Sequence, residues 1–192
     1  MRAIEKQFNP ESNLKGRMAE SLVYDLLKES GNETYHIGFE ATLPGLTRID
    51  EVFNRHGAIG NKIRIIPDFF VLNKNDDPYL IEVKFRWSPA GHESDPERLR
   101  LIAKFWQEAV VVFVNCSKQP YFRYTTYPFF KKNGEIDLKP LDEFPPLRIS
   151  ENMLVKYEAL VEKYLKPTLT SPLPKDSVVF EHPMQYVRPK KN

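Results

Sequence analysis

Two strand-like runs joined by turn-forming residues lie in the middle of this chain and constrain its fold most. Residues 66–72 and 79–84 are mainly apolar, and the six residues 73–78 between them are Asn, Lys, Asn, Asp, Asp and Pro. Turn formers between two such runs predict an antiparallel β-hairpin. Glu82 and Lys84 are two positions apart on the second run, so they share one face of that strand.

The pairing register of this hairpin decides where Asp68, on the first run, lies. Asp68 shares a face with Glu82 and Lys84 only where the numbers of opposed residues add up to an even value. A β-bulge near Pro67 would restore that geometry in the other register. Asp68 on the opposite face from Glu82, with no bulge, would contradict the grouping.

The composition limits the class of protein. A chain of 192 residues with 41% hydrophobic residues is long enough for one α/β core. A net charge of +2 is too small for a strongly basic nucleic-acid-binding domain, so any such binding depends on local charge. The one cysteine, Cys116, lies in an apolar run, which indicates a buried thiol in a reducing compartment. We find no secretory signal and no bilayer-spanning run, so we expect a soluble, cytoplasmic protein.

A helix and a strand are predicted at the start of the chain. The helix covers residues 14–29, with Ser12 or Asn13 as its N-cap and Gly31 as its left-handed terminator. Its apolar residues recur every three or four positions, which predicts a core-facing stripe. A strand is expected at 33–40.

The hairpin is flanked by two irregular segments. Residues 41–62 form a long connection that could contain a short helix at 49–53. Residues 85–95 indicate a loop, and a second helix opens at 95–97 with Pro at its first position. The almost wholly apolar run at 109–115 fits an interior strand that is covered on both faces.

The last third of the chain differs in its residue pattern. Residues 121–130 are aromatic and strand-like, and the Asn-Gly pair at 133–134 predicts a turn of an added β-ribbon. Period-two alternation favours a packed ribbon over a surface that stacks bases. A third helix is expected to begin after its N-cap Ser150, with Ile149 packing onto Leu154.

These elements suggest one domain with two parts. We assign residues 1–118 to a core, and residues 119–192 to a C-terminal extension packed on it. The extension comprises the β-hairpin, the helix and a proline-rich tail at 168–192. It could also mediate homodimer formation.

The hairpin carries a set of groups suited to phosphodiester chemistry. Carboxylates such as Asp68 and Glu82 are ligands for Mg²⁺, and the main-chain carbonyl of Val83 is a further hard oxygen ligand. The ammonium of Lys84 could stabilise the charge that develops on the phosphate or position a water molecule. Alternatively, Glu82 and Lys84 are a strand ion pair and Asp68 is a turn residue.

Pro67-Asp68 followed after thirteen residues by Glu82-Val83-Lys84 resembles the signature of the PD-(D/E)XK nuclease superfamily. The resemblance implies a restriction-endonuclease-like αβββαβ core with a mixed central sheet flanked by helices. It also implies a Mg²⁺-dependent endonuclease, with Mn²⁺ as a substitute and DNA as the expected substrate. Members often carry a glutamate on the first helix that joins the metal site, and Glu20 occupies a similar place.

Further polar side chains near the motif are candidates for contacts with nucleic acid. They are Arg17, Lys62, Arg64, Arg86, Lys104 and Gln107. Lys and Arg bind phosphates without reading sequence. Exposed strand-end charges explain Lys62, Arg64 and Arg86 equally well, and a solvated helix face explains Lys104 and Gln107 better.

The four histidines lack metal-ligand spacing, and only His92 is expected near the motif. A different class of function stays open, namely a nuclease-like module that binds nucleic acid or protein without turnover.

Overall fold

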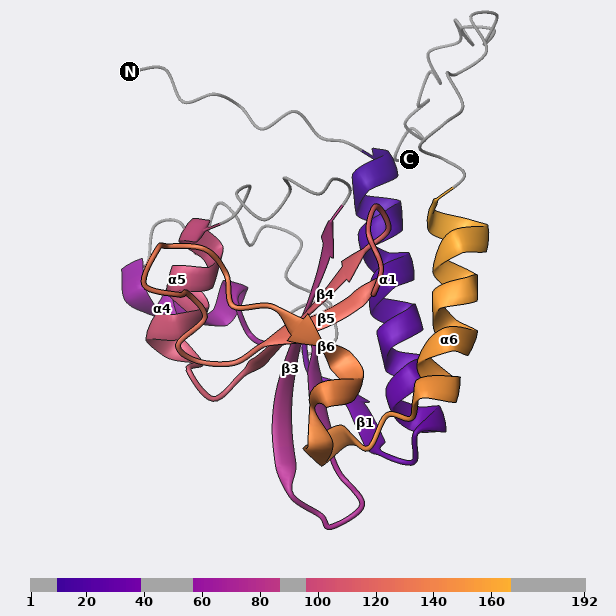
Figure 1. Cartoon of the computed structure of the whole chain (residues 1–192). Coiled ribbons are helices and arrows are strands. Elements are labelled where there is room, and N and C mark those ends of the chain that lie inside the picture. Colours follow the sequence, from indigo (N-terminus) through magenta and orange to yellow (C-terminus); the bar gives the residue numbers. More distant parts are fainter. Residues whose placement is uncertain (1–9, 39–56, 87–95, 167–192) are drawn as a thin grey trace, which may run out of the picture.

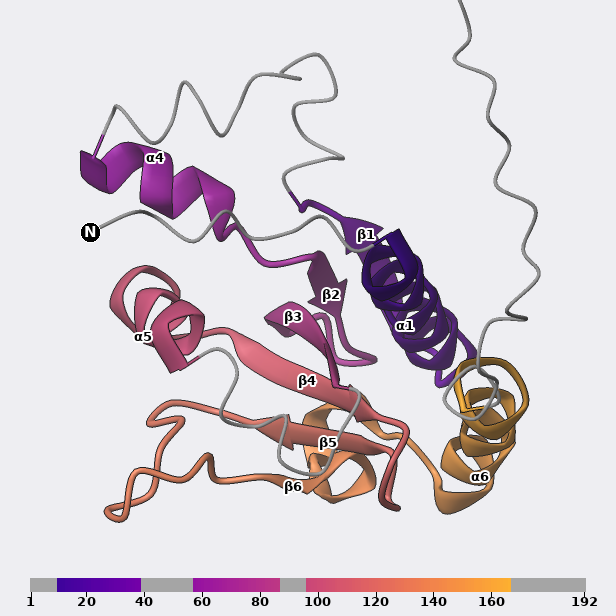
Figure 2. The same cartoon turned by 90° about the horizontal axis from the view of Figure 1, so that it is seen from above.

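A computed structural model describes residues 10–38, 57–86 and 96–166 of the chain (Figure 1). In these residues one six-stranded mixed β-sheet lies between two layers of helices, as the view from above shows (Figure 2). The mixed α/β class and the central sheet flanked by helices that the sequence predicts are therefore confirmed.

The sheet is ordered as the chain runs. Its strands are β1 (Glu33–His36), β2 (Phe69–Leu72), β3 (Pro78–Arg86), β4 (Val110–Asn115), β5 (Phe122–Thr125) and β6 (Lys139–Pro140). Neighbours in the sheet are also neighbours in this list. Strands β3 and β4 pair in parallel, whereas the other four adjacent pairs are antiparallel. A parallel pair needs a crossover, and helix α5 (Pro96–Phe105) supplies it.

The turn between β2 and β3 confirms the predicted hairpin. The side-chain Oδ1 of buried Asn73 accepts hydrogen bonds from the N–H groups of Asn75 at 2.8 Å and Asp77 at 3.0 Å. Asp76 adopts a left-handed φ of 62°, a conformation that Asp tolerates better than most residues. The turn formers thus stabilise the loop through hydrogen bonds from its backbone N–H groups to the Asn73 side chain. This loop lies at the bottom of Figure 1.

One face of the sheet is covered by α1 (Pro10–Glu29) and α6 (Glu151–Leu160), which continues into a π-helical turn, η4 (Val161–Leu165). On α1, Ala19, Val23 and Leu26 are spaced by four and three residues, and all three are fully buried. On the other helix, Leu154 and Tyr157 join the same apolar cluster. The two helices lie side by side in both views (Figures 1 and 2).

The opposite face is covered by α4 (Gly57–Arg64) and α5. Buried Leu99 and Ile102 of α5 pack in one cluster with Val111 and Phe113 of β4. The intervening Val112 belongs to the cluster on the α1 side. Strand β4 is therefore buried on both faces, as its continuous apolar run predicts.

The first helix ends where the sequence predicts but begins earlier. Gly31 has a φ of 84°, and its N–H donates to the Lys28 carbonyl at 2.9 Å, which confirms it as the terminator. The N-cap prediction is wrong, because the helix already starts at Pro10 and residues 12 and 13 lie inside it. Proline is well tolerated in a first helical turn, since the N–H it lacks has no helical partner there.

Boundaries around the hairpin also differ from expectation. Residues 57–62, expected as irregular, belong to α4, and the first strand ends at His36. Phe85 and Arg86, expected in a loop, continue β3 because they pair with Val114 and Asn115 of β4. The possible helix at 49–53 and the loop at 87–95, which includes His92, lie outside the described residues.

The ribbon expected as an addition is part of the central sheet instead. Strand β5 pairs antiparallel with β4, with Tyr124 opposite Val112. The predicted hairpin at the Asn-Gly turn is reduced to one bridge between Phe130 and Ile136, although Gly134 has the left-handed φ of 85°. The reason is packing, because Phe122 and Tyr124 bury their rings in the main core.

The start of the third helix agrees with the sequence. The Ser150 hydroxyl oxygen accepts a hydrogen bond from the Met153 N–H at 3.3 Å, which is the predicted N-cap. Ile149 and Leu154 are buried in the same cluster, in keeping with the predicted contact between them. The proline-rich tail lies outside the described residues. In the part of the chain that the structure describes, no helix has the length and hydropathy needed to cross a membrane.

Cys116 follows β4 and is fully buried. Burial raises the pKa of its thiol, and the Sγ lies 3.8 Å from the Arg86 carbonyl oxygen. A buried thiol with a raised pKa has little reactive thiolate. Cys116 is therefore a packing residue, as predicted.

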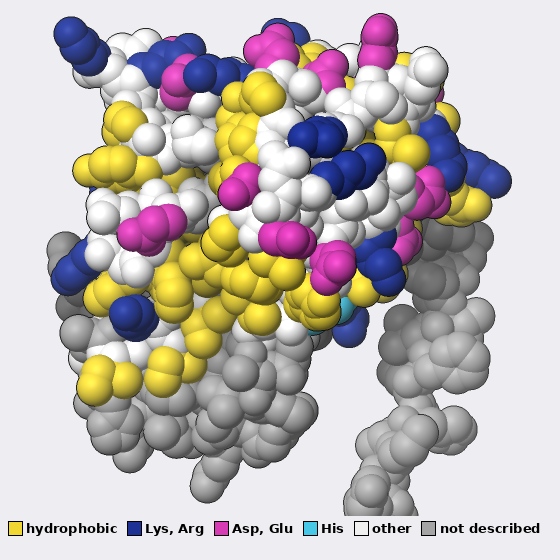
Figure 3. All heavy atoms as spheres, turned by 90° about the horizontal axis from the view of Figure 1, so that it is seen from below, with side chains coloured by type: hydrophobic (Ala, Val, Ile, Leu, Met, Phe, Trp, Pro, Cys, Tyr) yellow, Lys and Arg dark blue, Asp and Glu magenta, His cyan; other side chains and the backbone are white. Residues whose placement is uncertain are grey.

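The end of the molecule that carries the hairpin turn has a mixed surface (Figure 3). Hydrophobic side chains lie among Lys, Arg, Asp and Glu side chains, and neither sign of charge dominates this view. Nucleic-acid-binding surfaces are typically uniformly basic. The view therefore gives no reason to place nucleic acid at this end.

Candidate functional site

The register of β2 against β3 brings Asp68 and Glu82 together. Phe69 pairs with Ile81 and Val71 with Tyr79, so the numbers of opposed residues add up to an even value. Asp68 immediately precedes β2, and continuing this register by one residue places it opposite Glu82. The register condition derived from the sequence is therefore met without a bulge.

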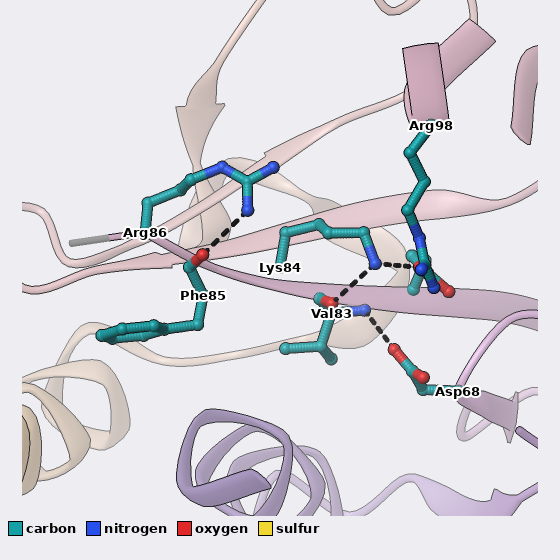
Figure 4. Close-up of polar contacts among 7 residues, drawn as sticks. Asp68, Val83, Lys84, Phe85, Arg86 and Arg98 are labelled. Carbon is teal, nitrogen blue, oxygen red and sulfur yellow. Dashed lines mark hydrogen bonds and ion pairs between the residues drawn. The ribbon is translucent and has the colours of Figure 1, made fainter. Parts of the chain in front are cut away.

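Glu82 is a fully buried carboxylate with unequal oxygens. Its Oε1 accepts from the Lys84 ammonium and, at 3.2 Å, from Nη2 of Arg98 on α5 (Figure 4). Its Oε2 is buried and has no hydrogen-bond partner among the described residues. Because a buried unpaired carboxylate oxygen is costly, it marks a place where a cation would be stabilising.

The side chain of Asp68 contacts β3, the strand that carries Glu82. Its Oδ2 accepts a hydrogen bond from the Val83 N–H at 2.7 Å. The Asp68 carbonyl in turn accepts from the N–H groups of Ile37 and Gly38, at 3.0 and 3.1 Å, which ties the end of β1 to the start of β2. The carboxylate is thus held on the backbone of β3.

The surroundings of Asp68 oppose the ionisation of its carboxyl group. Burial raises the pKa of Asp68 to about 7, and the charge of Glu82 acts in the same direction. Lys84 and the Val83 N–H lower the pKa but do not outweigh these effects. A carboxyl group that resists ionisation beside a second carboxylate favours a bound cation.

Lys84 holds its ammonium on the same side of β3 as Glu82. Its Nζ also lies 3.3 Å from the Val83 carbonyl oxygen, and the side chain is only 11% exposed. The carbonyl of Val83 is therefore near the carboxylates, although it already accepts from Lys84. Lys84 thus lies where an anion bound beside Glu82 would meet it.

Glu20 is partly buried on α1. The negative charge of Glu20 also raises the pKa of Asp68, and it does so less than burial and Glu82 do. Among the described residues, however, no three His, Cys, Asp or Glu side chains are placed to hold a metal ion. A cation here would use two carboxylates, with the Val83 carbonyl as an additional oxygen.

A divalent cation fits this set of groups. The Oε2 of Glu82 has no hydrogen-bond partner among the described residues, and the raised pKa of Asp68 means that its ionised form is disfavoured, so a cation beside these two groups would be stabilising. Carboxylate and carbonyl oxygens are the ligands that Mg²⁺ and Mn²⁺ take. The residues present therefore suit Mg²⁺ better than a soft metal.

Arg98 is the site residue that the sequence reasoning missed. The sequence indicates Lys104 and Gln107 as the candidates from this segment, yet Arg98 on α5 makes the contact with Glu82. Arg98 precedes buried Ile102 by four residues, and side chains at this spacing share a helix face. This spacing could have indicated that Arg98 is directed toward the sheet.

The other basic candidates lie on several elements. Arg17 is exposed on α1, and Lys62 and Arg64 are exposed in the last turn of α4. The alternative interpretation of Lys62 and Arg64 as strand-end charges is wrong, because this segment is helical. The Lys62 ammonium lies 5.2 Å from the centroid of the Trp106 ring.

Lys104 and Gln107 are both exposed, the first in the last turn of α5 and the second just beyond it. Arg86 is partly buried at the end of β3, and its Nη1 donates to the Phe85 carbonyl at 2.8 Å. Its guanidinium also lies 5.4 Å from the centroid of the Phe113 ring. Lys84 and Arg98 are the basic residues for which a contact with Glu82 is evident.

Comparison of the chain with protein-family models, with characterised proteins and with solved structures finds no match.

Proposed function

We propose that this protein is a metal-dependent nuclease of the PD-(D/E)XK superfamily, with a restriction-endonuclease-like core, that hydrolyses phosphodiester bonds in DNA. The observation that carries the proposal is the cluster of buried Glu82 with partly buried Asp68 and Lys84, in which Glu82 Oε2 has no partner among the described residues. An acidic group with a perturbed pKa beside a second carboxylate is typical of functional sites.

The order of elements supports the same proposal. Helix α1, strands β1 to β3, helix α5 and strand β4 follow one another along the chain, with α4 inserted before β2. Among the described residues this order resembles the αβββαβ order expected of that superfamily, with α4 in addition. Asp68 immediately precedes β2, and Glu82 and Lys84 lie on β3, in keeping with the second and third strands on which the resemblance expects the motif.

Asp68 and Glu82 would hold a Mg²⁺ ion, with the Val83 carbonyl as a further ligand. When bound, the ion supplies positive charge that stabilises the phosphate and promotes attack by water. The protein contributes the buried position of Glu82 and the partly buried position of Asp68, which limit competition from bulk water. Glu20 is close enough to influence Asp68 and would orient water or assist the ion.

Lys84 would act on the phosphate itself. Its ammonium lies beside Glu82 and is 11% exposed, so it can face an anion that approaches from solvent. As water attacks phosphorus and the bond to the leaving oxygen breaks, negative charge increases on the phosphate oxygens. A fixed ammonium at this place stabilises that charge.

A cleavage assay tests the proposal. Linear, branched and single-stranded DNA and RNA would be incubated with the protein and Mg²⁺ or Mn²⁺. We expect cleavage of a DNA substrate that depends on the metal and that falls about 100-fold or more in Asp68→Ala and Lys84→Ala. Matched controls are Asp142→Ala and Lys118→Ala, which replace exposed residues of the same types. Metal-dependent cleavage that survives both site substitutions would refute the assignment.

One observation favours a second candidate, a nuclease-like module that binds nucleic acid without turnover. Glu82 already pairs with Lys84 and Arg98, and such pairing is also found in purely structural ion pairs. A titration with Mn²⁺ separates the two functions. A protein that binds DNA but takes up no Mn²⁺ would be the module.

A further inference from the structure

Arg98 is the more exposed of the two basic side chains that contact the buried carboxylate Glu82. Its Nη2 lies 3.2 Å from Glu82 Oε1, and its side chain is 40% exposed, against 11% for Lys84 and none for Glu82. Figure 4 shows the Arg98 side chain extending from α5 toward the site. Of the two cationic side chains, Arg98 is therefore the more accessible to a ligand that enters from solvent.

The charges of the cluster balance without a metal ion. Asp68 and Glu82 carry two negative charges when ionised, and Lys84 and Arg98 carry two positive charges. Both cationic groups contact the same oxygen, Glu82 Oε1, and leave Oε2 unpartnered among the described residues. A divalent cation on the carboxylates would add two positive charges and leave the cluster with a deficit of negative charge.

That excess positive charge would weaken the contact between Arg98 and Glu82. Asp68 and Glu82 would hold the cation, which would take over the neutralisation of Glu82 and would repel the nearby guanidinium. Of the two cationic side chains, Arg98 is the more exposed and can therefore turn toward solvent more readily. Its planar group of five N–H donors matches the oxygens of a phosphate.

We propose that Arg98 exchanges partners during substrate binding, from Glu82 in the metal-free protein to an oxygen of the phosphodiester at the cleavage site in the metal-loaded protein. This inference rests on the proposed nuclease function. It makes Arg98 a substrate-binding residue that also balances the charge of Asp68 and Glu82 in the metal-free protein. The phosphate restores the negative charge that the metal-loaded cluster lacks.

The exchange predicts opposite effects of Arg98 on its two ligands. In Arg98→Ala we expect kcat/KM for DNA cleavage in Mn²⁺ to fall by about 10- to 100-fold, the usual loss for a hydrogen bond between charged groups. In the same variant, Mn²⁺ binding measured without DNA should become about threefold tighter or more, because a competing positive charge is gone. Arg98→Lys should recover part of the cleavage activity.

Arg100→Ala is the matched control, since Arg100 is an exposed arginine on the same helix. We expect it to change neither quantity by more than about twofold, as for most surface substitutions. Weaker Mn²⁺ binding in Arg98→Ala would show that Arg98 merely positions Glu82, and this would overturn the exchange. Unchanged cleavage in that variant would overturn it as well, while leaving the nuclease assignment intact. A wild-type protein that binds neither Mn²⁺ nor DNA would refute both proposals.

Discussion

At the scale of single residues, Asp68 is an ionisable group in surroundings that oppose its ionisation. Burial and the neighbouring Glu82 raise its pKa to about 7. Without a cation, deprotonation of Asp68 therefore costs folding free energy at neutral pH. Functional sites often carry such a cost, because the group is positioned for a ligand and not for stability.

Replacement of Asp68 by Asn should stabilise the metal-free protein in a pH-dependent way. The pKa of Asp68 is about 7 in the folded protein and near 3.8 in the unfolded chain, so the folded state holds this proton more tightly. The resulting stability is complete below about pH 4 and is lost as the pH rises through 7. Urea unfolding at pH 8 should show Asp68→Asn more stable by about 1–3 kcal/mol, since one pKa unit corresponds to about 1.4 kcal/mol.

The same comparison near pH 3.5 should show almost no difference, because Asp68 is then mostly protonated in both states. Asn keeps an oxygen that can accept from the Val83 N–H, so the wild type and the variant differ in charge at this position and not in that hydrogen bond. Asp142→Asn, at an exposed site, should be neutral at both pH values. An equal gain at both pH values would mean that charge is not the cause.

Addition of Mn²⁺ should offset the greater stability of Asp68→Asn over the wild type at pH 8. A ligand that binds only the folded state at a concentration 100 times its Kd stabilises that state by about 2.7 kcal/mol. We expect a gain of this size for the wild type at pH 8 and a much smaller gain for Asp68→Asn or Glu82→Gln. Thermal unfolding with and without Mn²⁺ measures it. Equal gains in all three proteins would place the ion elsewhere.

Part of this cluster could be predicted from the sequence, for a geometric reason. Alternation along a strand fixes that Glu82 and Lys84 share a face, and one condition on register adds Asp68. The contact of Arg98 with Glu82 depends on how α5 crosses β3, which no local pattern specifies. Sequence reasoning therefore found the residues of the hairpin and missed the one from the helix.

At the scale of elements, the end of α1 depends on Gly31. Its φ of 84° lies in the left-handed region, and a Cβ there would meet the side chain of Lys74. Gly31→Ala should therefore lower the free energy of unfolding by about 1 kcal/mol or more. Urea unfolding at neutral pH measures this loss.

Gly16 provides the opposite control within the same helix. A Cβ at this position meets nothing within 4 Å, and the backbone is helical. Gly16→Ala should stabilise the protein by about 0.5–1 kcal/mol, because alanine has the higher helix propensity. Destabilisation of equal size by both substitutions would show that conformation at Gly31 is not the cause.

Elements with a strong local signal were predicted well. The apolar spacing of α1, the turn formers after β2 and the continuous apolar run of β4 each specify one structure. The aromatic segment around β5 has an equally clear strand pattern, but the pattern does not name the partner strand. Its pairing with β4 is decided by burial of Phe122 and Tyr124 in the common core.

At the scale of the whole molecule, both halves of the chain build one core. The cluster under α1 contains residues of β2 and β3 together with residues from beyond position 118. The latter are Tyr121, Phe122, Tyr124, Leu141, Leu147, Ile149, Leu154, Tyr157, Val161 and Leu165. Strand β5 also covers the edge of β4, whose six residues are all buried.

A chain that ends at residue 118 should therefore fail to fold cooperatively. Full burial of one large apolar side chain contributes about 1.5–3 kcal/mol, and a domain has only about 5–15 kcal/mol of net stability. Loss of ten buried side chains exceeds that margin, and it exposes the apolar edge of β4 to aggregation. A chain that ends at residue 166 keeps all of these side chains and serves as the control. We expect a cooperative urea transition and near-ultraviolet circular dichroism from the control alone. A cooperative transition in the shorter chain would show that the motif-bearing half is stable without the strands and helix that follow it.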